Sequence, residues 1–453
     1  MPDELDVSFS DTMTVAQRDA LIARLRTAWN NLPPATQDQL KPILDDAHQQ
    51  FAHFVATGTP PSHDVHSVLR IKSYLTGDWD NHLAKMGQPL NKAVAQPLAE
   101  PIAPAAIELT VGPEGDIIGS GKYQTLDPRW DLVIGISLFE NLLHKHRFPS
   151  GAPQIQQIAD NATFVLIGDY GTGNFGSGDS PSTKISKFVP TLNPDYTIHL
   201  GDTYYAGTNP EETAKLLAYW PKGSKASFAL NSNHEMYSAG GPYFDSVIGN
   251  PIFNKLQSPW SFFALENTHW ILCGLDSAYF SSTAALFMSG TLGANNNQTQ
   301  FLQQVAARNK KTILFTHHNP IPIAGLNRAP KPGDEGFQLY SDVMSAFTGH
   351  PAPAYWYYGH KHVGAVYKPL PPGKLLCRCL GHGALPAGKA SDLVNSTHLD
   401  WFERCPANDP DDKLRIFNGF VHLELNGPDL TEIYYDEMNR VAWQPGTKDT
   451  RCP

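Results

Sequence analysis

Five short apolar segments of this chain each end abruptly in residues that can bind a metal ion. The first runs from Phe164 to Ile167 and is followed by Gly168 and Asp169. Such a run is typical of a strand buried on both faces, and open α/β sheets bind ligands at the carboxyl ends of such strands. A single Gly-Asp pair after a strand is common, so the constraint on the fold comes from the repetition of this pattern.

The four later segments are Ile198–Leu200, Phe228–Leu230, Ile313–Thr316 and Tyr355–Tyr358. They are followed by Gly201-Asp202-Thr203-Tyr204-Tyr205, Asn231-Ser232-Asn233-His234-Glu235, His317-His318-Asn319-Pro320 and Gly359-His360-Lys361-His362. If the five segments are strands of one fold, we expect these loops to gather at one rim, where their polar side chains enclose a common space.

The residue types in these loops suit a pair of metal ions. Carboxylate and phenolate oxygens stabilise a highly charged metal such as Fe(III), whereas imidazole and amide oxygen suit a divalent ion such as Zn, Mn or Fe(II). A carboxylate can bridge two ions, and two ions about 4 Å apart can hold both the attacking and the leaving oxygen of a displacement. His360 and His362 point the same way only in an extended chain, and on a turn they can approach different ions.

Several candidate ligands also have an ordinary structural explanation. Asp169 and Asp202 could be helix caps or turn residues, and Asn233 could be a turn former. Tyr205 could be packed or hydrogen-bonded, and the adjacent Tyr204 competes with it for a place in the site. The occurrence of five such loops in order favours a metal site over these separate explanations.

The part of the chain that carries these motifs begins at about residue 155. Predicted strands there first alternate with predicted helices and later follow one another directly. This order is typical of two sheets packed together with helices outside. We therefore predict an α/β fold over residues 155–453, with a two-sheet β-sandwich flanked by helices.

The N-terminal part has a different pattern. Apolar residues at helical spacing predict a small helical region over residues 1–86, with helices at residues 14–30, 35–56 and about 65–76. Thr14 is predicted to cap the first of these helices.

Two further segments connect this region to the main domain. Residues 87–106 are rich in proline and alanine, which predicts an extended linker, and residues 107–154 are predicted to form a hairpin and a helix. Residues 1–150 carry no recognisable catalytic motif. Their role stays open between capping the site, mediating oligomerisation and binding a partner.

The charge of the chain restricts its partners. With 34 basic and 44 acidic residues the formal charge is −10, and there is no dense block of Lys or Arg. Nucleic acid and anionic membranes are therefore poor candidates as partners. No apolar run approaches the length that crosses a bilayer. The acidic N-terminal residues lack the basic and apolar parts of a signal peptide, which favours the cytoplasm and leaves secretion open.

The five cysteines include no Cys-x-x-Cys pair. Cys377 and Cys379 would face the same side of one strand, where disulfide geometry is poor. Buried free thiols are therefore expected, and a bridge between Cys405 and Cys452 stays open.

The ordered motifs resemble those of the calcineurin-like metallophosphoesterase superfamily. The pattern of that superfamily is Asp-x-His or Asp-x-Gly, Gly-Asp, Gly-Asn-His followed by an acidic residue, His, and Gly-His-x-His, and the resemblance covers roughly residues 160–435. Two details resemble its purple acid phosphatase branch. Gly171 stands where many diesterases have a metal-binding His, and Gly201 to Tyr205 match the Gly-Asp-x-x-Tyr of that branch.

The resemblance implies two metal ions, Fe(III) and a divalent Fe, Zn or Mn. The implied ligands are Asp169, Asp202, Tyr205 and His362 for the first ion, with Asp202 bridging, and Asn233, His317 and His360 for the second. His317 is preferred to His318 because it directly follows the apolar strand. His318 would then contact the substrate, or the two histidines have the reverse roles.

The resemblance also implies a reaction. A metal-bound hydroxide would attack phosphorus, His234 would contact the phosphate and protonate or stabilise the leaving oxygen, and Glu235 would orient His234. Hydrolysis of small phosphate monoesters is the favoured function. The alternatives are hydrolysis of phosphodiesters, including cyclic nucleotides, and a non-catalytic scaffold with the same fold.

Overall fold

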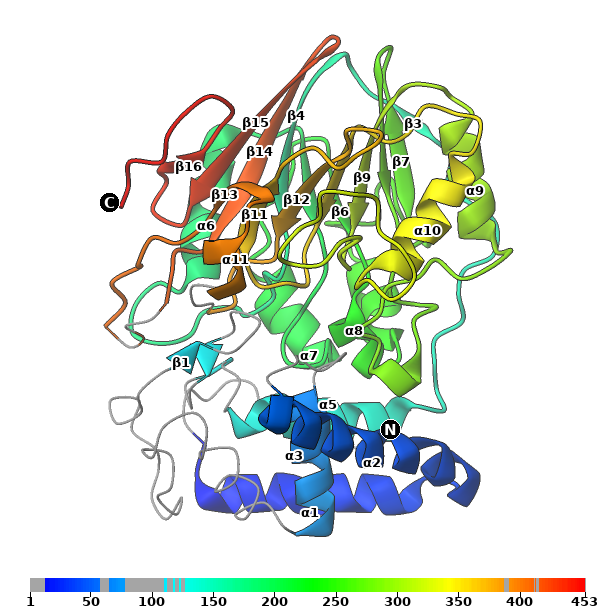
Figure 1. Ribbon diagram of the computed structural model, residues 1–453, viewed down its shortest axis with the longest axis vertical. Coiled ribbons are helices and arrows are strands. Elements are labelled where there is room, and N and C mark those ends of the chain that lie inside the picture. The colour runs from blue at the N-terminus through cyan, green and yellow to red at the C-terminus, as the bar shows by residue number, and fades with distance from the viewer. Residues whose placement is uncertain are drawn as a thin grey trace.

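Two β-sheets packed face to face form the body of the molecule, as the sequence predicts (Figure 1). The computed structural model describes residues 13–57, 65–77, 110–111, 117–118, 122–123, 127–386, 391–410, 412 and 415–452. Helices cover the outer faces of the sheets, and a layer of N-terminal helices lies at one end of the sandwich, at the bottom of Figure 1.

The first sheet has six strands. In spatial order they are β16 (Val441–Trp443), β15 (Asp429–Asp436), β14 (Gly419–Asn426), β4 (Asn161–Ile167), β5 (Tyr196–His199) and β6 (Ala226–Ala229). Strands β4, β5 and β6 are parallel neighbours, with Phe164 opposite Tyr196 and Tyr196 opposite Ala226. Their carboxyl ends therefore meet at one edge of the sheet.

The second sheet has eight strands. In spatial order they are β13 (Leu399–Phe402), β11 (Gly364–Tyr367), β12 (Leu376–Leu380), β10 (Tyr355–Tyr358), β9 (Lys311–Thr316), β8 (Trp270–Gly274), β7 (Phe263–Glu266) and β3 (Gln156–Gln157). Strands β9 and β10 are parallel, with Ile313 opposite Tyr355, so the loops that follow them also leave at one edge.

Apolar side chains on both faces of the central strands explain why these strands read as continuous apolar runs. Phe164 and Leu166 of β4 lie in the core between the two sheets, together with Ile313 of β9. Val165 and Ile167 belong to a second cluster on the other face of β4. The remaining helical segments of the sandwich are α6 (Pro181–Phe188), Val189–Leu192, α7 (Asn209–Glu211), Glu212–Leu217, α8 (Asn233–Tyr237), Tyr243–Val247, Thr283–Ala285, α9 (Asn297–Ala306), α10 (Phe337–Ala346) and α11 (Ser391–Asn395).

The predicted N-terminal helices are confirmed. They are α1 (Val15–Asn31), α2 (Pro34–Thr57) and α3 (Val65–Thr76), followed by α5 (Pro128–Asn141). Thr14 caps α1 as predicted: its hydroxyl accepts the N–H of Gln17, while the side chain of Gln17 accepts the N–H of Thr14. Strands β1 (Thr110–Val111) and β2 (Ile117–Ile118) pair antiparallel, and the linker predicted at residues 87–106 lies outside the described residues.

The N-terminal helices share one apolar core with the loops at the end of the sandwich. Leu25 of α1, Tyr74 of α3 and Leu132 of α5 belong to the same buried cluster as Tyr204 and Tyr205. Helix α5 also packs directly against α8. This continuity fixes the helical layer against the edge where the metal-ligand motifs emerge. The predicted domain limits stay predictions.

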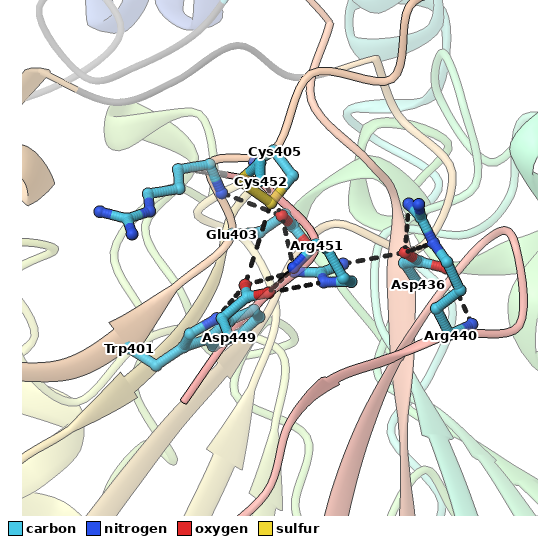
Figure 2. The surroundings of a disulfide bond; sticks show 9 residues. Trp401, Glu403, Cys405, Asp436, Arg440, Asp449, Arg451 and Cys452 are labelled. Carbon is cyan, nitrogen blue, oxygen red and sulfur yellow. Dashed lines mark hydrogen bonds and ion pairs between the residues drawn. A yellow bond between two sulfur atoms is a disulfide. The ribbon is translucent and has the colours of Figure 1, made fainter. Parts of the chain in front are cut away.

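A disulfide joins Cys405 to Cys452, so these two cysteines are not free thiols (Figure 2). The Arg451 guanidinium forms ion pairs with Glu403, Asp436 and Asp449 at 2.8 to 2.9 Å, which hold the C-terminal segment against the sandwich. The other cysteines, Cys273, Cys377 and Cys379, are free and buried, as expected. Among the described helices, none is long and apolar enough to cross a membrane.

Candidate metal centre

The loops after β4, β5, β6, β9 and β10 converge, as the strand order requires. They bring together side chains from five separate segments, with ring or carboxylate atoms of Asp169, Asp202 and His317 all within 4.8 Å of one another. Asp169, Asp202 and His317 have no solvent exposure, and Asn233 is almost completely buried. A cluster of ionisable groups this deep in a protein needs partners or a bound ion, because burying a charge is costly.

Sharp turns aim these side chains. Asp169, Asp202, His360 and His362 have φ values of 55°, 77°, 69° and 30°, in the left-handed region that residues other than glycine rarely adopt. Each such residue costs on the order of 1–3 kcal/mol, and such conformations cluster at functional sites. Four of the predicted ligands thus share a backbone feature that is independent of their chemistry.

Two glycines allow the loops to approach closely. A Cβ atom on Gly201, whose φ is 103°, would lie 2.7 Å from Nδ1 of His317. A Cβ atom on Gly171 would lie 2.5 Å from Cα of Thr203 and 2.8 Å from the carbonyl oxygen of Asp202. Gly171 therefore packs against the turn that carries Asp202, and there is no room for a longer side chain at that position.

One half of the site is rich in nitrogen ligands. Nε2 of His317 lies 2.9 Å from Oδ1 of Asn233 and 3.2 Å from Nδ1 of His360, and this Oδ1 is 3.2 Å from Nδ1 of His360. The amide nitrogen of Asn233 donates to the hydroxyl of Tyr237, which fixes the direction of its oxygen. Oδ1 of Asp202 completes this half, 3.2 Å from Nε2 of His317.

In the nitrogen-rich half, lone pairs of neighbouring side chains face one another. Nδ1 of His317 lies 2.9 Å from the carbonyl oxygen of Leu200, which can only accept, so the neutral ring carries its hydrogen on Nδ1. Burial lowers the pKa of His317 to about 4. Nε2 is then an acceptor that faces the oxygens of Asn233 and Asp202, and a cation between these three atoms would turn their repulsion into coordination.

The other half of the site is rich in oxygen ligands. The hydroxyl of Tyr204 lies 3.0 Å from both Oδ1 of Asp169 and Oδ2 of Asp202. Nε2 of His362 is 3.5 Å from Oδ1 of Asp169, and the N–H of His360 donates to its other oxygen at 2.9 Å. Burial and the nearby Asp202 raise the pKa of Asp169. Since Oδ1 of Asp202 faces His317 and Oδ2 faces Tyr204, Asp202 lies between the two halves.

Tyr204, and not Tyr205, reaches this cluster, so the predicted role of Tyr205 as a metal ligand does not fit the structure. The hydroxyl of Tyr205 donates instead to Oδ2 of Asp127 at 2.6 Å, on the side of the N-terminal helices. The ring of Tyr205 packs against Tyr123, with centroids 4.9 Å apart. The sequence pattern contains both tyrosines side by side, and only the path of the backbone decides which one faces the site.

His234 lies beside the cluster, oriented by a backbone group. Its Nδ1 is 2.5 Å from the carbonyl oxygen of Tyr205, and its Nε2 is 3.9 Å from Oδ2 of Asp202. The prediction that Glu235 orients His234 is wrong in this structure. The carboxyl group of Glu235 accepts from the hydroxyl of Ser232 and from the N–H of Asp202, so it supports the loop that carries Asp202.

His318 is buried beside the cluster, with a ring nitrogen within 4.8 Å of ligand atoms of His317 and His360, and both of its ring nitrogens have hydrogen-bond partners. Its Nδ1 is 2.8 Å from the hydroxyl of Ser277, and its Nε2 is 2.8 Å from the carbonyl oxygen of Phe287. With both ring nitrogens occupied and the side chain buried, the predicted substrate contact of His318 does not fit. His318 lies against His360, at 4.7 Å between ring centroids, and supports its position.

One neighbour of the cluster was not predicted. The indole of Trp130, in the first turn of α5, stacks on Tyr204 at 5.5 Å between centroids and meets His234 edge-on at 5.2 Å. Trp130 lies in the segment 107–154, where the sequence predicts a hairpin and a helix, and no local pattern connects it to loops more than 30 residues away in the sequence. Its place at the site depends on the packing of α5 against α8.

A comparison with known protein families agrees with this geometry. Residues 153–364 match the family model of the calcineurin-like phosphoesterases. No curated protein matches the chain. A conserved uncharacterized protein of Streptococcus pneumoniae TIGR4, described as a predicted phosphoesterase, is 11% identical with a TM-score of 0.27, covering 63% of this chain and 94% of that one. A hypothetical protein from Thermus thermophilus is 10% identical with a TM-score of 0.31, covering 60% and 99%.

Proposed function

Because the chain carries a calcineurin-like phosphoesterase domain over residues 153–364, we propose that it hydrolyses small phosphate monoesters with the help of two metal ions. The observation that carries the proposal is the set of lone pairs around Nε2 of His317. An imidazole nitrogen, an amide oxygen and a carboxylate oxygen, all buried, form a donor set that fits a divalent metal.

We assign the ligands by the two halves of the site. Asn233, His317 and His360 hold one ion, Asp169, Tyr204 and His362 hold the other, and Asp202 is shared between them. The phenol oxygen of Tyr204 supports Fe(III) in the oxygen-rich half, and the nitrogen-rich half supports divalent Fe, Zn or Mn. When bound, the ions supply positive charge that offsets the charge of the phosphate and makes water a better nucleophile.

We assign proton transfer to His234. Its Nδ1 hydrogen donates to the carbonyl oxygen of Tyr205, which fixes the ring and leaves Nε2 directed toward the cluster. When water attacks phosphorus and the ester P–O bond breaks, the unprotonated Nε2 can take a proton from the attacking water and pass it to the leaving oxygen. The fixed ring makes this transfer possible without reorganisation of the loop.

Two features support monoesters over the alternative, phosphodiesters. Gly171, which stands where many cyclic-nucleotide diesterases have His, packs against the turn that carries Asp202. Tyr204 adds a phenol oxygen to the cluster, one position before the tyrosine that matches the Gly-Asp-x-x-Tyr pattern of the purple acid phosphatase branch. A non-catalytic scaffold is disfavoured, because each half of the site retains a full set of candidate ligands.

This proposal is tested by measuring the turnover of p-nitrophenyl phosphate and of bis-p-nitrophenyl phosphate. Each assay contains a defined metal: Fe, Zn or Mn. We expect a higher kcat/KM for the monoester with at least one metal. A higher kcat/KM for the diester would replace the monoesterase by a diesterase. Hydrolysis of neither ester with any metal would leave only the scaffold.

The disulfide gives evidence on the cellular compartment in which the protein works. Disulfides persist in oxidising environments and are rare in the cytosol. The Cys405–Cys452 bridge therefore supports an oxidising compartment, against the cytoplasmic expectation from the N-terminal residues. Mass measurement of the protein from its native cells, alkylated before and after reduction, tests this: two cysteines should become reactive only after reduction, and their reactivity without reduction would contradict it.

A further inference from the structure

The candidate metal centre is accessible on the side of its neighbours His362 and Trp130. His362 has 19% of its side chain exposed, and Trp130 is also partly exposed, whereas Asp169, Asp202 and His317 are fully buried. A phosphate ester that enters from this side passes these two side chains. The group attached to its phosphate, which is the larger part of most substrates, then remains near them.

Trp130 lies against the residues that we assign to the reaction. Its ring stacks on Tyr204 with centroids 5.5 Å apart, and meets His234 at 5.2 Å and His362 at 6.3 Å, nearly perpendicular to both. His234 is the residue assigned to the leaving oxygen. The leaving group that this oxygen carries therefore has an indole as its neighbour.

The position of Trp130 is fixed by contacts at the beginning of α5. Asp127 caps the helix by accepting the N–H of Arg129 at 3.0 Å, and it also accepts the hydroxyl of Tyr205 at 2.6 Å. The guanidinium of Arg129 lies over the ring of Tyr205 at 5.9 Å. Since Tyr205 belongs to the loop that carries Asp202, the first turn of α5 and this loop form one packed unit.

We infer that Trp130 determines substrate specificity by packing against the leaving group of aryl phosphate esters, and this inference rests on the proposed function. Indole rings attract other aromatic rings through offset stacking and edge-to-face contacts. The helical layer would then complete the active site by supplying its apolar wall. A small polar leaving group, such as glycerol, gains nothing from this wall.

Replacing the indole by a smaller apolar side chain tests the inference. We compare Trp130→Leu with the native protein, using phenyl phosphate and glycerol 2-phosphate as substrates. We expect kcat/KM for phenyl phosphate to fall roughly two- to tenfold more than kcat/KM for glycerol 2-phosphate, the range that an aromatic pair contributes. The metal content and the inhibition constant of inorganic phosphate should stay unchanged, since neither involves the leaving group.

Trp29→Leu is the matched control. Trp29 is also a partly exposed tryptophan of the helical layer, but it packs against Phe139 at 5.2 Å. We expect this variant to leave the ratio of the two kcat/KM values unchanged. An unchanged ratio in Trp130→Leu, in a protein that hydrolyses both esters, would overturn the inference alone. A native protein that hydrolyses neither ester would overturn the proposed function as well.

Discussion

The loops of the sandwich and the N-terminal helical layer contribute to the same site in different ways. All the assigned ligands come from loops that follow five central strands. The helical layer contributes Asp127, which accepts the hydroxyl of Tyr205, and Trp130, which stacks on Tyr204. The donor atoms are therefore organised locally at strand ends, whereas some of the residues that pack around them come from a distant part of the chain.

The largest effect is expected from the loops. His317→Ala removes the nitrogen at the centre of the lone-pair cluster, so we expect loss of bound metal and of measurable turnover. Residues that merely orient metal ligands already contribute about 10–100-fold, and a ligand should contribute more. Elemental analysis and p-nitrophenyl phosphate hydrolysis measure both. His350→Ala, whose ring contacts Asn309, is the control; a His317→Ala variant that keeps its metals and activity would contradict the assignment.

His234→Ala should separate proton transfer from metal binding. We expect turnover to fall by about 10²–10⁴, the usual contribution of a general acid, while the metal content stays the same. Esters with good leaving groups should be less affected, because their leaving oxygens need a proton less. Unchanged turnover of glycerol 2-phosphate would exclude His234 from proton transfer.

Tyr204 contacts the metal-ligand cluster and Tyr205 contacts the N-terminal helical layer, so substitutions of these two tyrosines can be compared directly. Tyr204→Phe removes the hydroxyl that contacts Asp169 and Asp202, so we expect loss of the visible absorption of an Fe(III)–phenolate and lower turnover. Tyr205→Phe removes a buried hydrogen bond to Asp127. We expect that variant to lose about 1–3 kcal/mol of unfolding free energy and to keep its absorption. The reverse pattern would make Tyr205 the ligand.

The smallest effect is expected in the helical layer away from the site. Arg24 of α1 and Glu140 of α5 form a half-exposed ion pair at 2.8 and 2.9 Å. Glu140→Gln should lower the free energy of unfolding by about 0–1 kcal/mol, as is usual for exposed ion pairs. Its kcat/KM should equal that of the native protein. A large loss of activity in a folded Glu140→Gln variant would show that parts of the helical layer other than the first turn of α5 also affect the site.

The sequence predicted the fold and most of the cluster, because both depend on local patterns. A buried parallel strand requires a continuous apolar run, and the residue after it is carried to the sheet edge, as for Asp169 and His317. The choice between Tyr204 and Tyr205 depends on the backbone path of one turn. The roles of Glu235 and His318 depend on which atoms surround them, and a sequence pattern does not contain that information.

The position of Trp130 at the site was also not predictable from local sequence patterns. Its contacts with Tyr204 and His234 arise because α5 packs on α8, and helical periodicity predicts only that α5 has an apolar face. The Cys405–Cys452 bridge likewise depends on the return of the C-terminal segment to the sandwich. Long-range packing decides these features.

Metal stoichiometry with activity tests the central claim most directly. The protein is purified without added metals, and elemental analysis and turnover of p-nitrophenyl phosphate are measured before chelation, after chelation and after return of Fe, Zn or Mn. The lone pairs around His317 and the oxygens around Asp169 predict about two ions per chain, loss of turnover with the ions, and its recovery when they return. A metal-free protein with full turnover would contradict the account.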